Sequence, residues 1–365
     1  MPKVVSVGIC PPPHVLNQDT VVEFAKELFS DAYRDINRLL QVFENGQVEK
    51  RHFVNDMAWF RQDHSFEERN DTYIEQAKQL GAKAIETCLM NQAFLRRPVE
   101  AGEIDAFFFI SSTGIATPSV DARIMNMLPF SPHAKRIPIW GLGCAGGAAG
   151  LSRAFEYCRA FPAAKVLVLA VELCSLTFQR NDLSKSNLIG TSLFADGVAA
   201  VLVAGDEADV AALSALPVLP AYMDSQSTLM PDSEGVMGWD VKSNGLYVVF
   251  SKDIPAIIRG WLRPNVESFL ERHGLAMTDV PHFIAHPGGK KVLEAYQAAL
   301  GVRPEQTGIS FDVLREYGNM SSATVLYVLE RYMQQVKQAG EAGIVAALGP
   351  GFSSELILVR WEEVR

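Results

Sequence analysis

The segment Ile137-Pro-Ile-Trp-Gly-Leu-Gly-Cys-Ala-Gly-Gly-Ala-Ala-Gly-Leu151 decides the fold, because it places one cysteine between a glycine turn and a run of small residues that favour a helix. The turn places Cys144 at the start of that helix. Unpaired N–H groups and the positive end of the helix dipole stabilise an anion there. The segment therefore predicts a nucleophilic thiol whose pKa lies below its ordinary value of about 8.5. The alternative is a buried cysteine on a tightly packed core helix.

Two later segments also place a polar side chain in a glycine-rich turn. Pro281-His-Phe-Ile-Ala-His-Pro-Gly-Gly-Lys290 predicts a short strand that ends at His286, directly before the next helix. Glu316-Tyr-Gly-Asn-Met-Ser-Ser-Ala-Thr-Val-Leu326 puts Asn319 after a glycine and before a helix of small residues, as around Cys144. Strand ends that lead into glycine turns often carry the chemistry of α/β enzymes. The structural alternatives are a hydrogen-bonded core histidine and an ordinary helix N-cap.

Apolar strands alternate with helices along the whole chain, which predicts a layered α/β protein. Continuous apolar runs such as Val166–Val171 indicate sheets that are covered on both faces. We expect strands at Val4–Ile9, Ala106–Ile110, Lys165–Val171, Val198–Ala204, His282–His286, Ile344–Leu348 and Leu356–Trp361. We expect helices near Gln18–Phe29, Glu67–Leu89, Ala145–Ala160, Ile254–Arg272, Lys290–Ala299 and Ser321–Lys337.

The two halves of the chain resemble each other. In each half, a residue in a glycine turn (Cys144 or Asn319) opens a small-residue helix that leads into an apolar strand. If a pseudo-two-fold axis relates the halves, both helix starts converge on one site. We place the boundary between residues 1–210, which carry the cysteine, and residues 211–365, which carry the histidine and the asparagine, because charge and loop composition rise over Asp206–Val218.

Two long polar stretches contain charged residues mixed with aromatic ones. They are Asn45–Glu68 and Asp224–Gly245. We expect both to be loops over the face of the active site.

Composition limits the class of protein. Of the 365 residues 48% are hydrophobic, enough for a large core, and the formal net charge of -9 argues against binding to nucleic acid or anionic membranes. No basic-then-apolar leader and no apolar run of about 18 residues is present, so we expect a cytoplasmic protein without stable membrane insertion. No metal-binding pattern is present, so no metal is expected. The five scattered cysteines indicate reduced thiols (Cys10, Cys88, Cys144, Cys158 and Cys174).

Seven motifs in order along the chain resemble the chalcone synthase family of type III polyketide synthases. They are Ser111-Ser-Thr-Gly-Ile-Ala-Thr-Pro118, Gly141-Leu-Gly-Cys-Ala-Gly-Gly147, Glu172-Leu-Cys-Ser-Leu-Thr-Phe178, Gly190-Thr-Ser-Leu-Phe-Ala-Asp-Gly197, Ala285-His-Pro-Gly-Gly289, Tyr317-Gly-Asn-Met-Ser-Ser322 and Gly349-Pro-Gly351. The resemblance covers essentially the whole chain. It implies a thiolase-like fold with a duplicated βαβαβ core in an αβαβα arrangement, a catalytic triad of Cys144, His286 and Asn319, and a homodimer.

The resemblance also implies a decarboxylative condensation of an acyl-CoA starter with malonyl-CoA. Cys144 would share its proton with His286 and take the acyl group from the starter. His286 and Asn319 would then donate hydrogen bonds to the enolate oxygen that forms when malonyl-CoA loses CO2. No acidic residue directly flanks any of the three in sequence, which suits a developing negative charge. No metal or redox cofactor is expected, and CoA thioesters enter only as substrates.

Substrate-binding positions are carried over from the family. Phe194 matches a gatekeeper phenylalanine, for which core packing is the alternative, and Val248 stands where plant chalcone synthases have a second one, which predicts a wider passage. Thr117 and Cys174 match positions in the cavity wall, and Thr117 is expected in a turn at the dimer interface, near the partner's cavity. Further substrate contacts are implied at Gly190, Ser321, Gly349, Pro350 and Gly351.

CoA phosphates require cations at the mouth of a tunnel. Arg38, Lys50 and Arg51 are the candidates, with Gly288 and Gly289 as further CoA contacts. An ordinary solvated face is the alternative for each cation.

The chain most resembles bacterial members that use long fatty acyl starters and make alkylpyrones. One alternative is a β-ketoacyl-ACP synthase III, which stops after a single condensation. The other is a catalytically idle acyl-binding homologue, against which the presence of all three catalytic residues argues.

Overall fold

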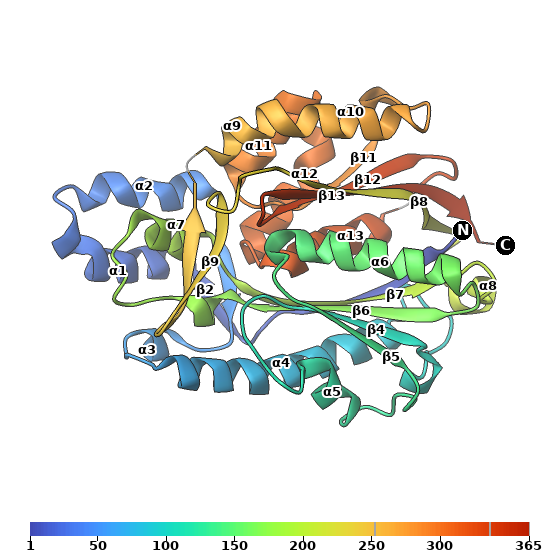
Figure 1. The fold of residues 1–365 in the computed structure, drawn as a ribbon, viewed down its shortest axis with the longest axis horizontal. Helices are drawn as coiled ribbons and strands as arrows, with labels where there is room; N and C mark the ends of the chain where they lie inside the picture. Colours follow the sequence, from blue (N-terminus) through green and yellow to red (C-terminus); the bar gives the residue numbers. More distant parts are fainter. Residues whose placement is uncertain (252, 336, 365) are drawn as a thin grey trace.

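The computed structural model describes residues 1–251, 253–335 and 337–364, and these form five layers of helices and sheet (Figure 1). The central layer contains α6 (Gly146–Ala160) and α13 (Thr324–Gln334), which lie between two sheet layers. One outer face is covered by α4 (Phe66–Leu89) and α5 (Val120–Met125), and the other by α10 (Arg263–Glu271) and α11 (Lys290–Leu300). The expected αβαβα arrangement is confirmed.

In the part of the chain that the structure describes, nine strands form the two sheet layers. Hydrogen bonds link them in the order β11-β12-β13-β8-β1-β7-β6-β4-β5, and the halves join where Lys3 of β1 pairs with Ala221 of β8. The sheet therefore wraps around the central helices. The strands span β1 Lys3–Cys10, β4 Ala106–Ile110, β5 Lys135–Ile139, β6 Lys165–Leu173, β7 Asp196–Ala204, β8 Val218–Leu229, β11 His282–Ala285, β12 Ala342–Gly349 and β13 Ser353–Glu363.

The apolar strands form the middle of the first sheet layer, as their sequences predict. Every residue of β4 and β7 is buried, and β6 is buried from its second residue onward. Helices cover both faces, so these strands need no polar side to face water.

The starts of the two central helices touch because small residues stand there. A side-chain carbon at Gly147 would lie 2.1 Å from the backbone oxygen of Ser322, so only glycine permits this approach. Short 3₁₀ turns precede both helices, at Gly143–Ala145 and Ser321–Ala323. The layout shared by the two halves of the sequence therefore brings the turn of Cys144 against the turn of Asn319.

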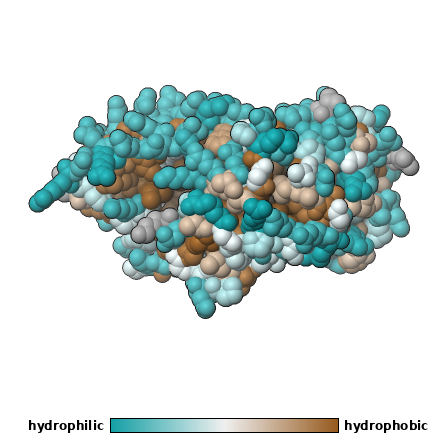
Figure 2. Space-filling view, turned by 90° about the horizontal axis from the view of Figure 1, so that it is seen from above, coloured by the Kyte–Doolittle hydropathy of each residue, from teal (hydrophilic) through white to brown (hydrophobic). Residues whose placement is uncertain are grey.

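Several further elements gather at one end of the layers, opposite the two termini (Figure 1). They are α1 (Gln18–Phe29), α2 (Ile36–Gly46), α3 (Met57–Phe60), α7 (Lys185–Leu193), the β2–β3 pair (His14–Asn17 and Lys50–Phe53) and the β9–β10 hairpin (Met237–Lys242 and Gly245–Phe250). From above, the surface is mostly hydrophilic, and one apolar patch lies over the end that carries α1 and α2 (Figure 2).

Several sequence-based expectations are wrong in detail. The stretch Asn45–Glu68 contains β3 and α3, and Asp224–Gly245 contains the end of β8 and all of β9, so neither is only a loop. The helices α2, α7, α8 (Val210–Leu213) and α12 (Pro304–Tyr317) and the strand β5 were not expected.

The helix expected at Ile254–Arg272 is also divided. It consists of α9 (Ile254–Ile257), a π-helical turn at Ile258–Leu262, and α10. Pro264 lies in the first turn of α10 and has no N–H to donate to the preceding turn.

Candidate active site

Cys144 lies in the 3₁₀ turn between β5 and α6. Gly143 precedes it with a φ of +47°, a left-handed conformation that suits glycine, and Pro350 packs so closely that a side-chain carbon at Gly143 would lie 2.8 Å from it. The thiol side chain is only 9% exposed.

Backbone hydrogen bonds fix His286 and Asn319 in place. His286 follows β11 directly, and its N–H donates to the oxygen of Ala346 in β12 at 2.8 Å. Asn319 donates its N–H to the oxygen of Leu193 (2.8 Å) and accepts from the N–H of Ala195 (2.9 Å). Asn319 is thereby tied to the segment that carries Phe194.

The side chain of Asn319 contacts both the cysteine and the loop that follows the histidine. The Cys144 thiol donates to Asn319 Oδ1 at 3.9 Å, and Asn319 Nδ2 donates to the oxygen of Gly288 at 3.1 Å. The N–H of Ser321 also donates to Oδ1 at 2.8 Å. The structure therefore brings the cysteine turn, the asparagine turn and the histidine loop together.

The imidazole of His286 is buried and has no internal partner. Its Nδ1 and Nε2 both lack a hydrogen bond within the described part of the chain. Buried polar nitrogens are rarely left without a partner. A substrate oxygen or the Cys144 proton would provide a partner for one of the two ring nitrogens of His286.

Burial changes the protonation of both groups. It raises the pKa of the Cys144 thiol to about 11 and lowers the pKa of His286 to about 3. The expectation that the helix start alone lowers the thiol pKa is therefore wrong, because desolvation of the buried sulfur exceeds the effect of the N–H groups. Near neutral pH the thiol and the imidazole are therefore both uncharged.

A buried carboxylate beside the cysteine was missed by the sequence reasoning. Glu172 ends the apolar run of β6, is fully buried, and accepts hydrogen bonds from Ser112 N–H and Oγ (both 3.1 Å) and from Ser322 Oγ (2.6 Å). Burial raises its pKa to about 7, and its negative charge adds to the rise in the pKa of Cys144. An acidic residue at the end of an apolar strand was the signal that could have revealed it.

Four of the predicted substrate residues line one apolar cavity: Cys174, Gly190, Phe194 and Val248. The Phe194 ring lies 5.6 Å from that of Trp239 and 5.5 Å from that of Phe250, both on the β9–β10 hairpin. These two aromatic neighbours were missed because most of the hairpin was expected to be a loop. The thiol of Cys174 is neutral, since burial raises its pKa well above the usual value.

The other predicted substrate residues occupy two places. Ser321 is buried next to Asn319, and its hydroxyl opposes the rise in the pKa of Cys144. Gly349 packs against the cysteine turn. A side-chain carbon added at Gly349 would lie 2.6 Å from the Cβ atom of Ala145. Pro350 and Gly351 form the turn that directly follows Gly349. Thr117, in contrast, is exposed and does not line the apolar cavity.

Arg51 does not lie at the mouth of a tunnel, and that expectation is wrong. The residue is 1% exposed, and Nη1 donates to the oxygens of Thr191 (2.6 Å) and Phe194 (2.9 Å), while Nη2 donates to Gln18 Oε1 (2.8 Å). The side chain therefore holds the end of α7 and cannot reach a phosphate in solvent.

The remaining CoA candidates lie near the surface. Arg38 on α2 and Lys50 at the start of β3 are exposed. Gly288 binds the Asn319 amide through its oxygen, and Gly289 precedes the first turn of α11.

Among residues 1–251, 253–335 and 337–364 there is no group of three or more side chains that could hold a metal ion. In the same part of the chain no helix is both long and apolar enough to cross a membrane.

The geometry agrees with what comparison to known proteins finds. The family model described as chalcone and stilbene synthases, N-terminal domain, matches residues 2–207, and the corresponding C-terminal domain matches residues 222–362. The chain belongs to the chalcone and stilbene synthase family of type III polyketide synthases. It is therefore an acyltransferase that catalyses decarboxylative condensation. This membership sets aside the ketoacyl synthase and idle-homologue alternatives.

Relatives of this polyketide synthase are similar over nearly their whole length. It is 50% identical over 361 residues to a putative chalcone synthase of Bacillus subtilis (strain 168), which covers 99% of each chain. It is 30% identical to the alpha-pyrone synthesis polyketide synthase-like Pks18 of Mycobacterium tuberculosis, over 95% of this chain and 88% of the relative. The crystal structure of 1,3,6,8-tetrahydroxynaphthalene synthase from Streptomyces coelicolor A3(2) matches with a TM-score of 0.90 and 30% identity, covering 99% of each chain.

Proposed function

We propose that this type III polyketide synthase condenses a long-chain fatty acyl-CoA starter with malonyl-CoA to give alkylpyrones. The apolar cavity beside the site supports a fatty acyl starter, because its lining includes Phe24, Phe53, Phe60 and Phe178. The similarity to a relative named for alpha-pyrone synthesis supports the product class.

In this proposal the three residues divide the chemistry. Cys144 passes its proton to His286, attacks the starter thioester, and holds the acyl group while CoA leaves as the thiol. His286 and Asn319 then donate to the enolate oxygen of malonyl-CoA as CO2 leaves, and the carbanion attacks the Cys144 thioester. The contact of Asn319 with both the thiol and the Gly288 loop carries this proposal. No metal or redox cofactor enters these steps.

We further propose that Arg38 and Lys50 meet the CoA phosphates, since both are exposed. Ser321 and the Gly349–Gly351 turn, which pack beside Cys144, would contact the growing chain.

We also propose a cytoplasmic homodimer. Exposed apolar side chains near Thr117 support the dimer interface, since Ile115 is 45% exposed and Trp140, which donates to the oxygen of Gly114, is 52% exposed. Light scattering of the purified chain would measure the oligomeric state, and a monomer would contradict this part of the proposal.

Mass spectrometry of products tests the central proposal. The enzyme is incubated with malonyl-CoA and a panel of acyl-CoA starters of increasing length, and we expect pyrones from the long-chain members. The Cys144→Ala variant is the control and should give none. Products from short starters alone, or single-condensation products alone, would contradict the proposal.

A further inference from the structure

Two cavities lie next to each other between the first half of the chain and the β9–β10 hairpin. The acyl cavity is the apolar one lined by Cys174, Phe194 and Val248. A second one, which we call the polar cavity, has a volume of about 350 Å³. It lies between α3, the start of α4 and the tip of the β9–β10 hairpin, and its lining includes His64, Arg69, Arg180 and Asn244.

The two cavities have only two lining residues in common, Phe60 and Phe178. Their ring centroids lie 6.4 Å apart at an interplanar angle of 74°. The Phe178 ring also makes an edge contact with Phe24 (5.7 Å), and the Phe60 ring makes one with Phe53 (5.4 Å). Phe24 and Phe53 line only the acyl cavity. Phe60 and Phe178 therefore form a wall between the two cavities, and residues of the acyl cavity pack against both of their rings.

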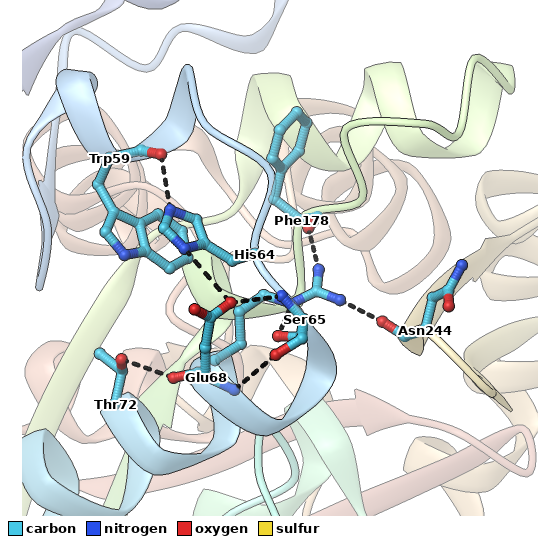
Figure 3. Close-up of polar contacts among 8 residues, drawn as sticks. Trp59, His64, Ser65, Glu68, Thr72, Phe178 and Asn244 are labelled. Carbon is cyan, nitrogen blue, oxygen red and sulfur yellow. Dashed lines mark hydrogen bonds and ion pairs between the residues drawn. The ribbon is translucent and has the colours of Figure 1, made fainter.

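The space behind this wall does not suit an alkyl chain. Arg69 is buried there, and its guanidinium donates to the backbone oxygens of Phe178 (2.7 Å) and Asn244. Figure 3 shows the backbone oxygens of Phe178 and Asn244 facing this group. It also shows the ring of His64 flat against that of Trp59, and the ring centroids are 4.0 Å apart. A methylene group that entered this cavity would leave apolar surroundings for polar ones.

Two lining residues of the acyl cavity, Phe194 and Cys174, lie next to residues of the active site. Phe194 is joined to Asn319 by a backbone bridge, and the charge of Cys144 acts on the Cys174 thiol. An acyl chain on the Cys144 sulfur that enters beside Phe194 and Cys174 would thus extend toward Phe60 and Phe178.

We propose that Phe60 and Phe178 are the end wall of the acyl cavity and set an upper limit on the length of the saturated starter chain. This inference rests on the proposed use of fatty acyl-CoA starters. Each methylene buried in the acyl cavity should raise kcat/KM about fourfold. The gain should stop once the terminal methyl group reaches the two rings.

The test measures kcat/KM for saturated acyl-CoA starters of increasing chain length, with malonyl-CoA in excess. Phe60→Leu and Phe178→Leu replace a ring of the wall by a smaller side chain. In these variants the fourfold rise in kcat/KM for each methylene should continue to chains that are longer by two or more carbons than those that the wild type accepts best. Phe66→Leu is the matched control, because Phe66 lines the polar cavity and not the acyl cavity, and its length profile should match that of the wild type.

The outcomes separate this inference from the proposed function. Circular dichroism establishes that each variant is folded, and Phe178, which is only partly buried, carries the test if the Phe60 variant does not fold. A length limit that stays unchanged in folded variants would overturn the wall alone. A wild-type enzyme that makes products from no fatty acyl-CoA would overturn the proposed function, and the wall with it.

Discussion

Replacing Asn319 with alanine is expected to slow the decarboxylation of malonyl-CoA far more than the loading of the starter onto Cys144. The amide has two N–H donors, of which one binds the oxygen of Gly288 at 3.1 Å. The other is free to meet the enolate oxygen that forms when CO2 leaves. Attack by the Cys144 thiolate needs no such donor from Asn319.

The size of the effect follows from the loss of one donor. Removal of a single hydrogen bond to an oxyanion typically lowers the rate about 100- to 1000-fold, or by about 2.7–4 kcal/mol of transition-state stabilisation. We expect that loss in decarboxylation. The rate of loading should fall by less than about tenfold, because the substitution changes only the surroundings of the Cys144 sulfur.

The two half-reactions can be assayed separately. Release of CO2 from malonyl-CoA without starter measures decarboxylation, and the mass of the acylated protein after rapid quenching measures loading. The substitution also leaves the N–H of Ser321 and the oxygen of Gly288 without this partner, which can cost about 1–3 kcal/mol of stability each. Thermal unfolding of the variant must therefore accompany the kinetics.

Gln306→Ala is the matched control. Gln306 is a buried carboxamide on α12 that donates to the oxygens of Val280 (2.9 Å) and Pro281 (3.2 Å), outside the active site. Its loss should affect stability and leave both half-reactions at wild-type rates. Equal losses of decarboxylation and loading in folded Asn319→Ala would refute the proposed division of roles.

Three further predictions concern the thiol, the acyl cavity and the buried arginine. His286→Gln should slow iodoacetamide labelling of Cys144 near neutral pH, because burial raises the pKa of the thiol to about 11 and the variant has no imidazole to take the proton; a labelling profile identical to that of the wild type would contradict this. Cys174→Phe should abolish the turnover of long starters and spare short ones, because the ring would fill the acyl cavity; product analysis across chain lengths is the check, and normal long-chain turnover would be decisive against it. Arg51→Met should lower the free energy of unfolding in urea by about 3–5 kcal/mol, because it removes a buried cation beside Asp196; the exposed Arg38→Met should change it by less than about 0.5 kcal/mol, and equal stabilities would count against the buried role.

The elements predicted best are those with a clear local hydrophobic pattern. The structure places β4 at Ala106–Ile110 and α1 at Gln18–Phe29, as expected, and β6 differs only by a longer carboxyl end. A run such as Val166–Val171 is strand-forming and buried wherever it lies, so local sequence is enough to locate it.

Elements whose polar residues find partners far along the chain could not be predicted in this way. The second half of β8 is rich in Asp, Ser, Gln and Thr, and it pairs with β13 along its whole length. Its Ser227 donates to Glu355 (2.7 Å), which also binds Arg153 on α6 (2.9 Å). A polar strand of this kind has the composition of a loop until its neighbours are known.

The same reason explains why the three turns that meet at the site are visible in the sequence, whereas the electrostatics around them are not. Cys144, His286 and Asn319 each stand in a glycine turn that is visible locally, whereas Glu172 comes to the site on a different strand. The carboxyl group is tolerated because Ser112 and Ser322 donate to it and because burial raises its pKa to about 7, so that a large share of it is uncharged near neutral pH. An enolate that forms nearby would favour the uncharged form further. The absence of acidic residues next to the triad in sequence therefore does not predict a site without a carboxyl group.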